Sequence, residues 1–387
     1  MTVHLPPLPD DPLVPEIDAA VERLSLPRRY EEIDRVREFP WAEYRALGAA
    51  HLLGLRTPSD RGGRGLPLPR VGALLFRLAY RSGTTFAKLS LQPEFCSVLG
   101  DHGSTSLRDA WFLPMVRGDR LVGNHLTEPS AGSDAGAIRL SATRDGDAYV
   151  LSGEKSEAAF VEEADAAIVY GVVSPAAEGG GPTAFLVPQD LPGITRVPGP
   201  GDLGERWQRR GSVRYLDVRV PASHRIGAEG EAFRYVRSEL TRERALLAAI
   251  YLGVGRASWD ETVAYVGDRS AFGRPLAAQQ AVAFPLVEDG AALEAAWLYV
   301  LRTLERLEAG EAAHGDAALS KWMATEAALR AIDHAIQFHG GRGYSRAYPH
   351  EQRWRDVRSG RIAHGPAEVM HVVAARELWP RGPTESR

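Results

Sequence analysis

Hydrophobic and polar positions change their spacing twice along the chain, which divides it into three regions. In residues 12–121, apolar residues recur at helical spacing in stretches such as "AEYRALGAAHLLGL" and "LPRVGALLFRLAYRSG". Between 122 and 225 the apolar runs are short, rich in β-branched residues and separated by turns, as in "DAAIVYGVV" and "TAFLVP". From 226 to 379 long amphipathic helices return, for example in "AALSKWMATEAALRAIDHAIQFHGG". The pattern predicts a mostly α protein with a central β domain.

These changes of period also set the expected domains. We predict an N-terminal helical domain over 1–121, a central β domain over 122–225 and a C-terminal helical bundle over 226–387. No internal repeat interrupts this order. Periodicity alone does not name a function.

Composition narrows the classes of partner. The net charge of −4 gives no reason to expect a nucleic-acid partner or an anionic membrane partner. The single cysteine, Cys96, excludes intramolecular disulfides and cysteine zinc sites, and no metal site is predicted. The N-terminus lacks the basic and apolar segments of a secretory signal, and no apolar run reaches the ~18 residues of a membrane span, so we expect a cytoplasmic protein. Basic residues are nearly all Arg, a skew typical of a GC-rich genome; the lysines are Lys88, Lys155 and Lys321.

A polar, glycine-containing loop occupies the start of "LTEPSAGSDAGAIRLSATRDGDAYVLSGEK", residues 126–155. Thr127 and Ser133 carry hydroxyls in a segment made tight by Pro129 and Gly132. Such a loop can present N–H groups and hydroxyls to a polar ligand. The alternative is a lead-in to a hairpin, whose polar residues only satisfy the turn.

Two further segments have compositions that suit ligand binding, one to a phosphate and one through close approach of the backbone. In "RSAFGRPLAAQQAVAF", an arginine beside an aromatic residue and a helix start can hold a pyrophosphate, or the segment is an interhelical turn with solvated arginines. In "QFHGGRGYS", Gly340 and Gly341 either permit close backbone approach to a ligand or end a helix.

In this order and spacing the segments resemble the acyl-CoA dehydrogenase family, from about residue 42 to 379. "RTPSDRGGRGLPL", "DVRVPASHRIGAEGEAF" and "WRDVRSGRI" extend the match. The resemblance implies an N-terminal helical domain, a β-barrel and a four-helix bundle, assembled as a homotetramer (a dimer of dimers), with FAD between the barrel and the bundle. It implies flavin or thioester contacts from Leu126, Thr127, Gly132 and Ser133. It implies that a subunit interface completes the adenosine side of the FAD site with Arg269, Phe272, Gln280, Gln337, Gly340 and Gly341, with Glu368 nearby.

Two segments depart from the family pattern. After Lys155 the family reads W-[IV]-[ST], but here Glu157 stands for the Trp and Ala159 for the hydroxyl residue that meets flavin N5. Either the flavin loses these partners, or the loop has shifted and other residues cover the ring. Gln208 and Arg210 replace two further hydroxyl residues; Arg209 and Arg210 are either solvated or meet a phosphate of CoA or phosphopantetheine.

The catalytic base is the third departure. His364 stands where many members carry a glutamate, and a neutral imidazole can accept a proton. The pair Glu243–Arg244, however, matches the isovaleryl and long-chain branches and those acting on carrier proteins, which place their base there. We therefore expect Glu243 as the base and Arg244 beside the substrate. The alternative for Glu243 is a solvated acid in the first turn of a helix.

The resemblance implies FAD-dependent α,β-dehydrogenation of an acyl thioester, with flavin N5 as hydride acceptor. The acyl group is expected to be short, branched or unusual and carried on CoA or a carrier protein, in a biosynthetic pathway. Electron-transfer flavoprotein or oxygen would take the electrons. The alternatives are a flavin monooxygenase of the same fold, or a member without redox chemistry that acts as a scaffold or catalyses through His364 and Glu157.

Overall fold

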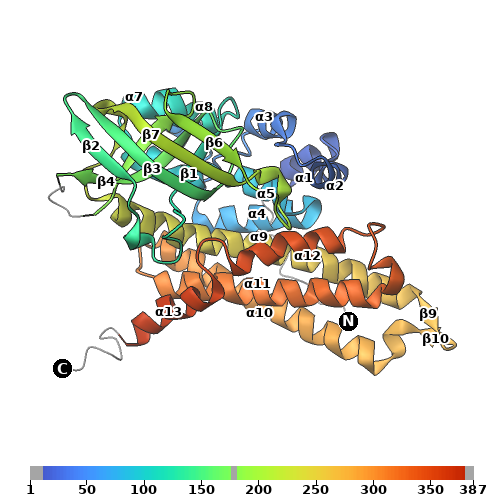
Figure 1. Ribbon diagram of the computed structural model, residues 1–387. Helices are drawn as coiled ribbons and strands as arrows, with labels where there is room; N and C mark the ends of the chain where they lie inside the picture. The colour runs from blue at the N-terminus through green and yellow to red at the C-terminus, as the bar shows by residue number, and fades with distance from the viewer. Residues whose placement is uncertain (1–11, 176–180, 380–387) are drawn as a thin grey trace.

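The computed structural model describes residues 12–175 and 181–379. Residues 1–11, on which the expectation of no secretory signal rests, lie outside the described part, as do 176–180 and 380–387. In Figure 1 the sheet and the N-terminal helices lie above a bundle of long C-terminal helices. In the described ranges, no helix combines the length and the apolar character needed to cross a membrane.

The N-terminal region is an array of helices packed on one another and on the bundle. In α4 (Leu68–Ser82), Val71, Leu74 and Leu78 recur at helical spacing and are buried. Gly72 lies where α4 meets the bundle, since a Cβ there would come within 2.4 Å of the Leu304 side chain. The other helices are α1 (Leu13–Arg23), α2 (Leu26–Val36), α3 (Trp41–Ala49), α5 (Thr84–Ser90), α6 (Ser97–His102), α7 (Thr105–Leu107) and α8 (Leu113–Val116).

The central region forms one eight-stranded sheet in the order β6-β7-β3-β2-β4-β5-β8, with β1 paired to β4. β1 and β2 run parallel to β4, and the other described pairings of this sheet are antiparallel. In β7, buried Val213 and Tyr215 alternate with more exposed residues, and a bulge at Asp217 (φ 52°) shifts the phase so that Val218 and Val220 are buried. The strands are β1 (Val122–His125), β2 (Ser141–Asp145), β3 (Ala148–Ala158), β4 (Ala166–Ser174), β5 (Thr183–Pro188), β6 (Ile194–Pro198), β7 (Gly211–Pro221) and β8 (Arg225–Ile226).

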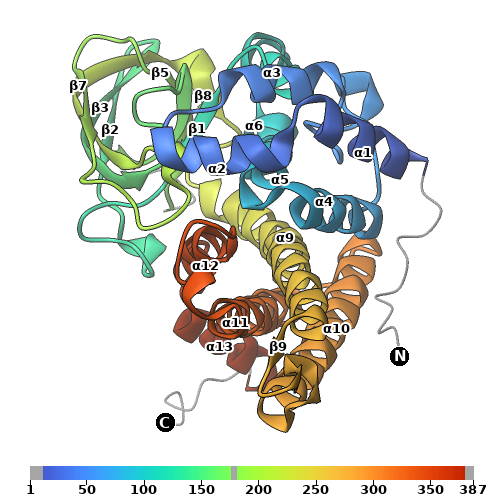
Figure 2. The same ribbon diagram turned by 90° about the vertical axis from the view of Figure 1, so that its right-hand side faces the viewer.

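The C-terminal region is built around α9 (Ala232–Asp268), whose 37 residues span about 55 Å. A short hairpin, β9 (Ser270–Ala271) and β10 (Arg274–Pro275), connects it to α10 (Gln280–Glu308). Figure 2 shows α9, α10 and α11 (His314–Phe338) side by side, with α12 (His350–Arg358) and α13 (Ala367–Leu378) against them.

α9 is the element that all parts of the fold share. It packs against α4 and α5 from the N-terminal region, against α10, α11 and α12 in the bundle, and against β5 of the sheet. Small residues make this possible: a Cβ at Gly255 would lie 2.7 Å from the Ala328 Cα on α11. Side chains on the first half of α9 therefore lie where the three regions meet.

Candidate active site

Two candidate proton acceptors from distant parts of the sequence lie next to each other. Glu243 is on α9 and His364 is in the loop before α13, and Oε2 of Glu243 is 3.4 Å from Nε2 of His364. The Glu243 side chain is 2% exposed. The interpretation of Glu243 as a solvated first-turn acid is wrong, because α9 begins at Ala232, about three turns earlier, and Glu243 is buried in its interior.

The backbone around His364 is fixed by two cationic side chains. Nε of Arg244 donates to the His364 carbonyl at 3.0 Å. Nζ of Lys321 donates to the carbonyls of both Ala363 and Gly365, the latter at 2.5 Å. His364 itself has φ of 56°, a left-handed conformation that needs such support. Arg244, expected beside the substrate, therefore also fixes the segment that holds the imidazole.

Burial and neighbouring charges shift the pKa values of the two acceptors in opposite directions. Burial raises the pKa of Glu243 well above its usual range, and the carboxylates of Glu239 and Glu94 raise it further. Burial lowers the pKa of His364 well below its usual range, and the nearby cation Lys321 adds to this. The imidazole is thus neutral, and the Glu243 carboxylate forms as the pH rises. A buried carboxylate of raised pKa suits the removal of a proton from carbon.

Glu239, one turn before Glu243, is a residue that the sequence analysis missed. It is 2% exposed and accepts hydrogen bonds from the Ser97 hydroxyl (3.1 Å), the Val98 N–H (2.9 Å) and the Asn124 side-chain amide (2.8 Å). Burial nevertheless raises its pKa to about 8. These bonds fix the first half of α9 against α6 and β1, and they place a second carboxyl beside the first.

The three lysines of the chain are all buried: Lys88 is 4% exposed, Lys155 0% and Lys321 1%. Lys155 forms an ion pair with Glu128 at 2.8 Å and donates to the Leu126 carbonyl at 2.9 Å. It thereby fixes the loop that carries the predicted flavin contacts. The scarcity of lysine could have pointed to these positions, because in this arginine-rich chain all three lysine side chains are buried.

Lys88 belongs to a second buried network. It forms an ion pair with Glu205 and donates to the Tyr251 hydroxyl at 3.2 Å. The Glu205 N–H donates to Asp356 at 2.6 Å, and the Tyr30 hydroxyl donates to the same carboxyl at 2.6 Å. Burial raises the pKa of Asp356 to about 7, and the Glu205 charge adds to this. The network ties α2, α5, α9 and α12 to the loop before β7.

The predicted flavin-contact loop follows β1. Leu126 and Thr127 are half-buried, and the Thr127 carbonyl accepts from the Ser156 N–H at 2.9 Å. Gly132 and Ser133 are exposed, and a Cβ at Gly132 would meet nothing within 4 Å. The loop is thus anchored at its start and open at its tip, where a ligand can approach the backbone closely.

Two of the departures from the family pattern meet each other. Glu157 is 66% exposed and forms an ion pair with Arg210 at 3.3 Å; Arg210 also binds Asp202 at 2.5 Å. The Glu157 charge is therefore neutralised and faces solvent. The Ala159 carbonyl lies 3.3 Å from Nε2 of His125, and burial lowers the pKa of this histidine to about 4. A neutral imidazole thus lies behind the segment that lacks the hydroxyl.

The neighbouring arginine also has carboxylate partners. Arg209 pairs with Glu162 and, at 3.0 Å, with Glu163. Gln208 donates to the Glu205 carboxylate at 3.3 Å. These contacts favour a structural role for both arginines over capture of a phosphate.

The residues predicted for the adenosine side of FAD gather at the far end of the bundle. Tyr265 of α9 stacks on His339 of α11 with ring centroids 4.1 Å apart, so the ends of these helices meet. Along α9, Arg269 is about 39 Å from Glu243. The Phe272 ring, at the tip of the hairpin, is 98% exposed. All six are exposed: Arg269, Phe272, Gln280, Gln337, Gly340 and Gly341.

Within one chain, Glu368 lies apart from the six residues predicted for the adenosine side. It is exposed on the first turn of α13, four residues after His364. Because Lys321 of α11 bonds the Gly365 carbonyl, Glu368 lies at the acceptor end, about 24 Å along α11 from Gln337.

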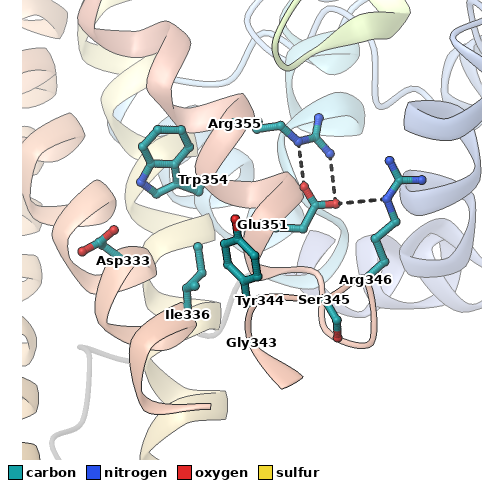
Figure 3. Close-up of a pocket in the computed structure, with 9 residues that line it drawn as sticks. All are labelled: Asp333, Ile336, Gly343, Tyr344, Ser345, Arg346, Glu351, Trp354 and Arg355. Atoms are coloured by element: carbon teal, nitrogen blue, oxygen red, sulfur yellow. Dashed lines mark hydrogen bonds and ion pairs between the residues drawn. The ribbon is translucent and has the colours of Figure 1, made fainter. Parts of the chain in front are cut away.

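A pocket of about 480 Å³ lies between the end of α11, the following loop and α12 (Figure 3). Tyr344 and Trp354 give it apolar surface, and Glu351 accepts a hydrogen bond at 2.7 Å from Nε of Arg355, one turn later on α12. Ile336 also lines it, directly before the predicted adenosine-side segment. The proton-acceptor pair lies elsewhere, so this pocket belongs to the far end of the bundle.

Comparison with known proteins places this geometry in a family. Models of the N-terminal, middle and C-terminal domains of acyl-CoA dehydrogenases match residues 17–119, 123–218 and 230–379. The chain belongs to the acyl-CoA dehydrogenase family. It is 31% identical over 348 residues to the mitochondrial short-chain specific acyl-CoA dehydrogenase of Bos taurus, covering 90% of this chain and 84% of the relative.

Other acyl-CoA dehydrogenases are similarly related. Benzylmalonyl-CoA dehydrogenase of Aromatoleum aromaticum is 32% identical over 351 residues, covering 89% of this chain and 92% of the relative. The structure of butyryl-CoA dehydrogenase from Megasphaera elsdenii matches with a TM-score of 0.89 at 27% identity, covering 98% of this chain and 100% of that chain. The predicted family and fold class are thus confirmed. The protein is an acyl-CoA dehydrogenase-like oxidoreductase that acts on CH–CH donors, and its cofactor is FAD.

Proposed function

We propose that this acyl-CoA dehydrogenase family member removes the α-proton of an acyl thioester with Glu243. The observation that carries the proposal is the buried Glu243 carboxyl, 3.4 Å from a neutral His364. A base needs an unprotonated acceptor within reach of the α-carbon, in a site that excludes water. The burial of Glu243 supports this choice, because it keeps water from the carboxyl, whereas the depressed pKa of His364 makes the imidazole a weak base.

Each residue of the site has a separate task. Glu243 accepts the α-proton, and His364 orients its carboxyl through Nε2. Arg244 and Lys321 hold the His364 backbone, and Arg244 lies beside the substrate. When bound, FAD supplies the acceptor for the β-hydride. Lys155 holds the Leu126 carbonyl, so that this loop presents a fixed edge to the flavin and the thioester.

The residues present fit FAD in two separate halves. Open space around Gly132 and exposed Ser133 suits the flavin side, and open space around Gly340 and Gly341 suits close approach of the adenosine side. The long separation along α9 supports a dimer of dimers, in which the hairpin of one subunit holds the adenosine half of its partner's FAD.

The acyl group is carried on CoA or on a carrier protein, and electron-transfer flavoprotein or oxygen takes the electrons. We further propose that the protein acts in the cytoplasm, in a biosynthetic pathway. Its three proposed domains span residues 1–121, 122–225 and 226–387.

The test is anaerobic mixing of the FAD-loaded protein with thioesters in a stopped-flow spectrometer. A dehydrogenase loses the absorbance of oxidised flavin, at roughly 450 nm, on mixing with thioester alone. A monooxygenase would instead require a separate reductant, and a protein without redox function would show no change with either. Either of these results would contradict the proposal.

A further inference from the structure

A cavity of about 10 Å³ lies between α4, α5 and α9, close to the proposed base. Leu246, on the wall formed by α9, is three residues after Glu243, about 4.5 Å along the helix axis. Val71 of α4 closes another side. A space of this size holds roughly one water-sized group. The rest of the lining is mixed: Gly54, Leu55 and Leu91 are not polar, and the polar side chains are those of Arg56, Thr57, Ser90 and Glu94.

Ser90 lacks the partner that similar hydroxyls in this chain have. Its side chain belongs to a residue only 3% exposed, and within the described ranges its Oγ makes no hydrogen bond. Other helical hydroxyls donate to the carbonyl four residues earlier, at 2.7–2.9 Å: Ser82, Thr241, Thr262, Thr303 and Thr325. A buried hydroxyl without a partner is costly, so a ligand group that bonds to it gains binding free energy.

Glu94 supplies an acceptor on the same wall. It is 8% exposed, and Oε1 accepts from Nε of Arg242 at 2.5 Å. Oε2 is 3.8 Å from Nη1 of Arg56, longer than a hydrogen bond. The next residue, Phe95, stacks on the His364 ring with centroids 5.3 Å apart. The Glu94 charge also raises the pKa of Glu243, so this side of the cavity lies near the acceptor pair.

We propose that this cavity recognises a hydroxyl or amino group on a short acyl chain, a few bonds from the α-carbon. The substituent donates a hydrogen bond to Oε2 of Glu94 and exchanges one with Oγ of Ser90. An alkyl chain of the same length would leave the Ser90 hydroxyl without a partner and Oε2 of Glu94 with only its 3.8 Å contact to Arg56. This proposal rests on the proposed dehydrogenase function, whose substrate class it defines.

The test compares thioesters that differ only in hydroxyl against methyl. The FAD-loaded protein is given γ-hydroxybutyryl-CoA against pentanoyl-CoA, and δ-hydroxypentanoyl-CoA against hexanoyl-CoA, with δ-aminopentanoyl-CoA to separate amine from hydroxyl. We expect kcat/KM for one hydroxyl or amino member to exceed its methyl partner by at least about tenfold. If kcat/KM for the methyl thioesters equals or exceeds that for the polar ones, this inference is wrong and the proposed dehydrogenase function stands. If no thioester bleaches the flavin, the proposed function fails instead.

Two serine variants test whether the Ser90 hydroxyl binds the polar substituent. Ser90→Ala should reduce the preference for the polar member to within about threefold of unity, whereas Ser82→Ala, a buried helical serine with a satisfied hydroxyl, should keep it. A preference unchanged in Ser90→Ala would overturn the assignment. Binding is measured separately by calorimetry with Glu243→Gln, which holds the thioester without reaction; equal affinity for both members of each pair would also overturn it. If Ser90→Ala does not fold, the wild-type ratios still decide.

Discussion

The two ends of α9 differ in how much of their site this chain supplies. At the acceptor end, Glu243 and Glu239 are 2% exposed. Glu239 accepts hydrogen bonds from α6 and β1, and Arg244 of α9 and Lys321 of α11 fix the backbone around His364. At the far end, Arg269 and Gln280 are exposed, and Phe272 projects almost fully into solvent. The first end has the features of a finished reaction site. The second has exposed polar groups and open glycines, and we propose that a partner subunit completes it. The following predictions test that contrast.

The largest effect is expected at the acceptor end. Glu243→Gln should lower kcat by at least roughly 10²–10⁴-fold, because a positioned base contributes that much, while FAD content stays at the wild-type level. Steady-state kinetics and the flavin-to-protein ratio measure both. His364→Gln should cost less, since it removes an orienting contact. If His364→Gln is inactive and Glu243→Gln retains activity, the assignment of the base is wrong.

The next effect concerns the far end. Arg269→Ala should weaken FAD binding about ten- to hundredfold, because a charge-assisted hydrogen bond contributes roughly 1.5–3 kcal/mol. Retention of FAD on dilution and gel filtration measures it. Arg302→Ala, an exposed arginine on α10 away from the hairpin, is the control and should keep its flavin. Equal FAD retention in both variants would contradict an adenosine site at this end.

A smaller change should appear in the pH profile. The Glu239 carboxylate raises the pKa of Glu243, so Glu239→Gln removes a repulsion and lets Glu243 lose its proton at lower pH. A base is active above its pKa. The acid limb of kcat/KM should therefore move to lower pH, and a shift to higher pH would show that Glu239 does not act on the base.

The smallest effect is expected at the exposed departure from the family pattern. Glu157→Gln should change the free energy of unfolding by less than about 1 kcal/mol, because its ion pair with Arg210 is solvent-exposed and Arg210 keeps Asp202. Urea denaturation measures this. A loss of flavin or of activity in this variant would show that Glu157 instead belongs to the cofactor site.

Local patterns in the sequence were sufficient to predict the fold class, and the family resemblance nominated Glu243 and His364. Helical and strand periods, together with motifs in a fixed order, report on each segment separately. Glu243 and His364 are 121 positions apart, so their contact depends on how the chain folds, and the structure shows it. Glu239 carries no motif, so its burial beside β1 was visible only in the structure.

The interior network was harder to predict because its partners come from all three regions. Lys88 meets Glu205 and Tyr251 only after the loop before β7 packs on α5 and α9. Likewise, the missing partner of Ser90 is a property of packing, since the residue type alone predicts an ordinary back-bonded hydroxyl. The scarcity of lysine was the one sequence signal for these positions.

The most direct test of the central claim is exchange of the α-proton, measured apart from flavin reduction. A thioester with sulfur in place of the β-carbon cannot give up a hydride, so it reports on the base alone. In D₂O, NMR should show the wild-type protein exchanging the α-protons of this analogue and His364→Gln doing so more slowly, with no exchange above background in Glu243→Gln. Exchange that persists in Glu243→Gln would contradict the role of Glu243 as base.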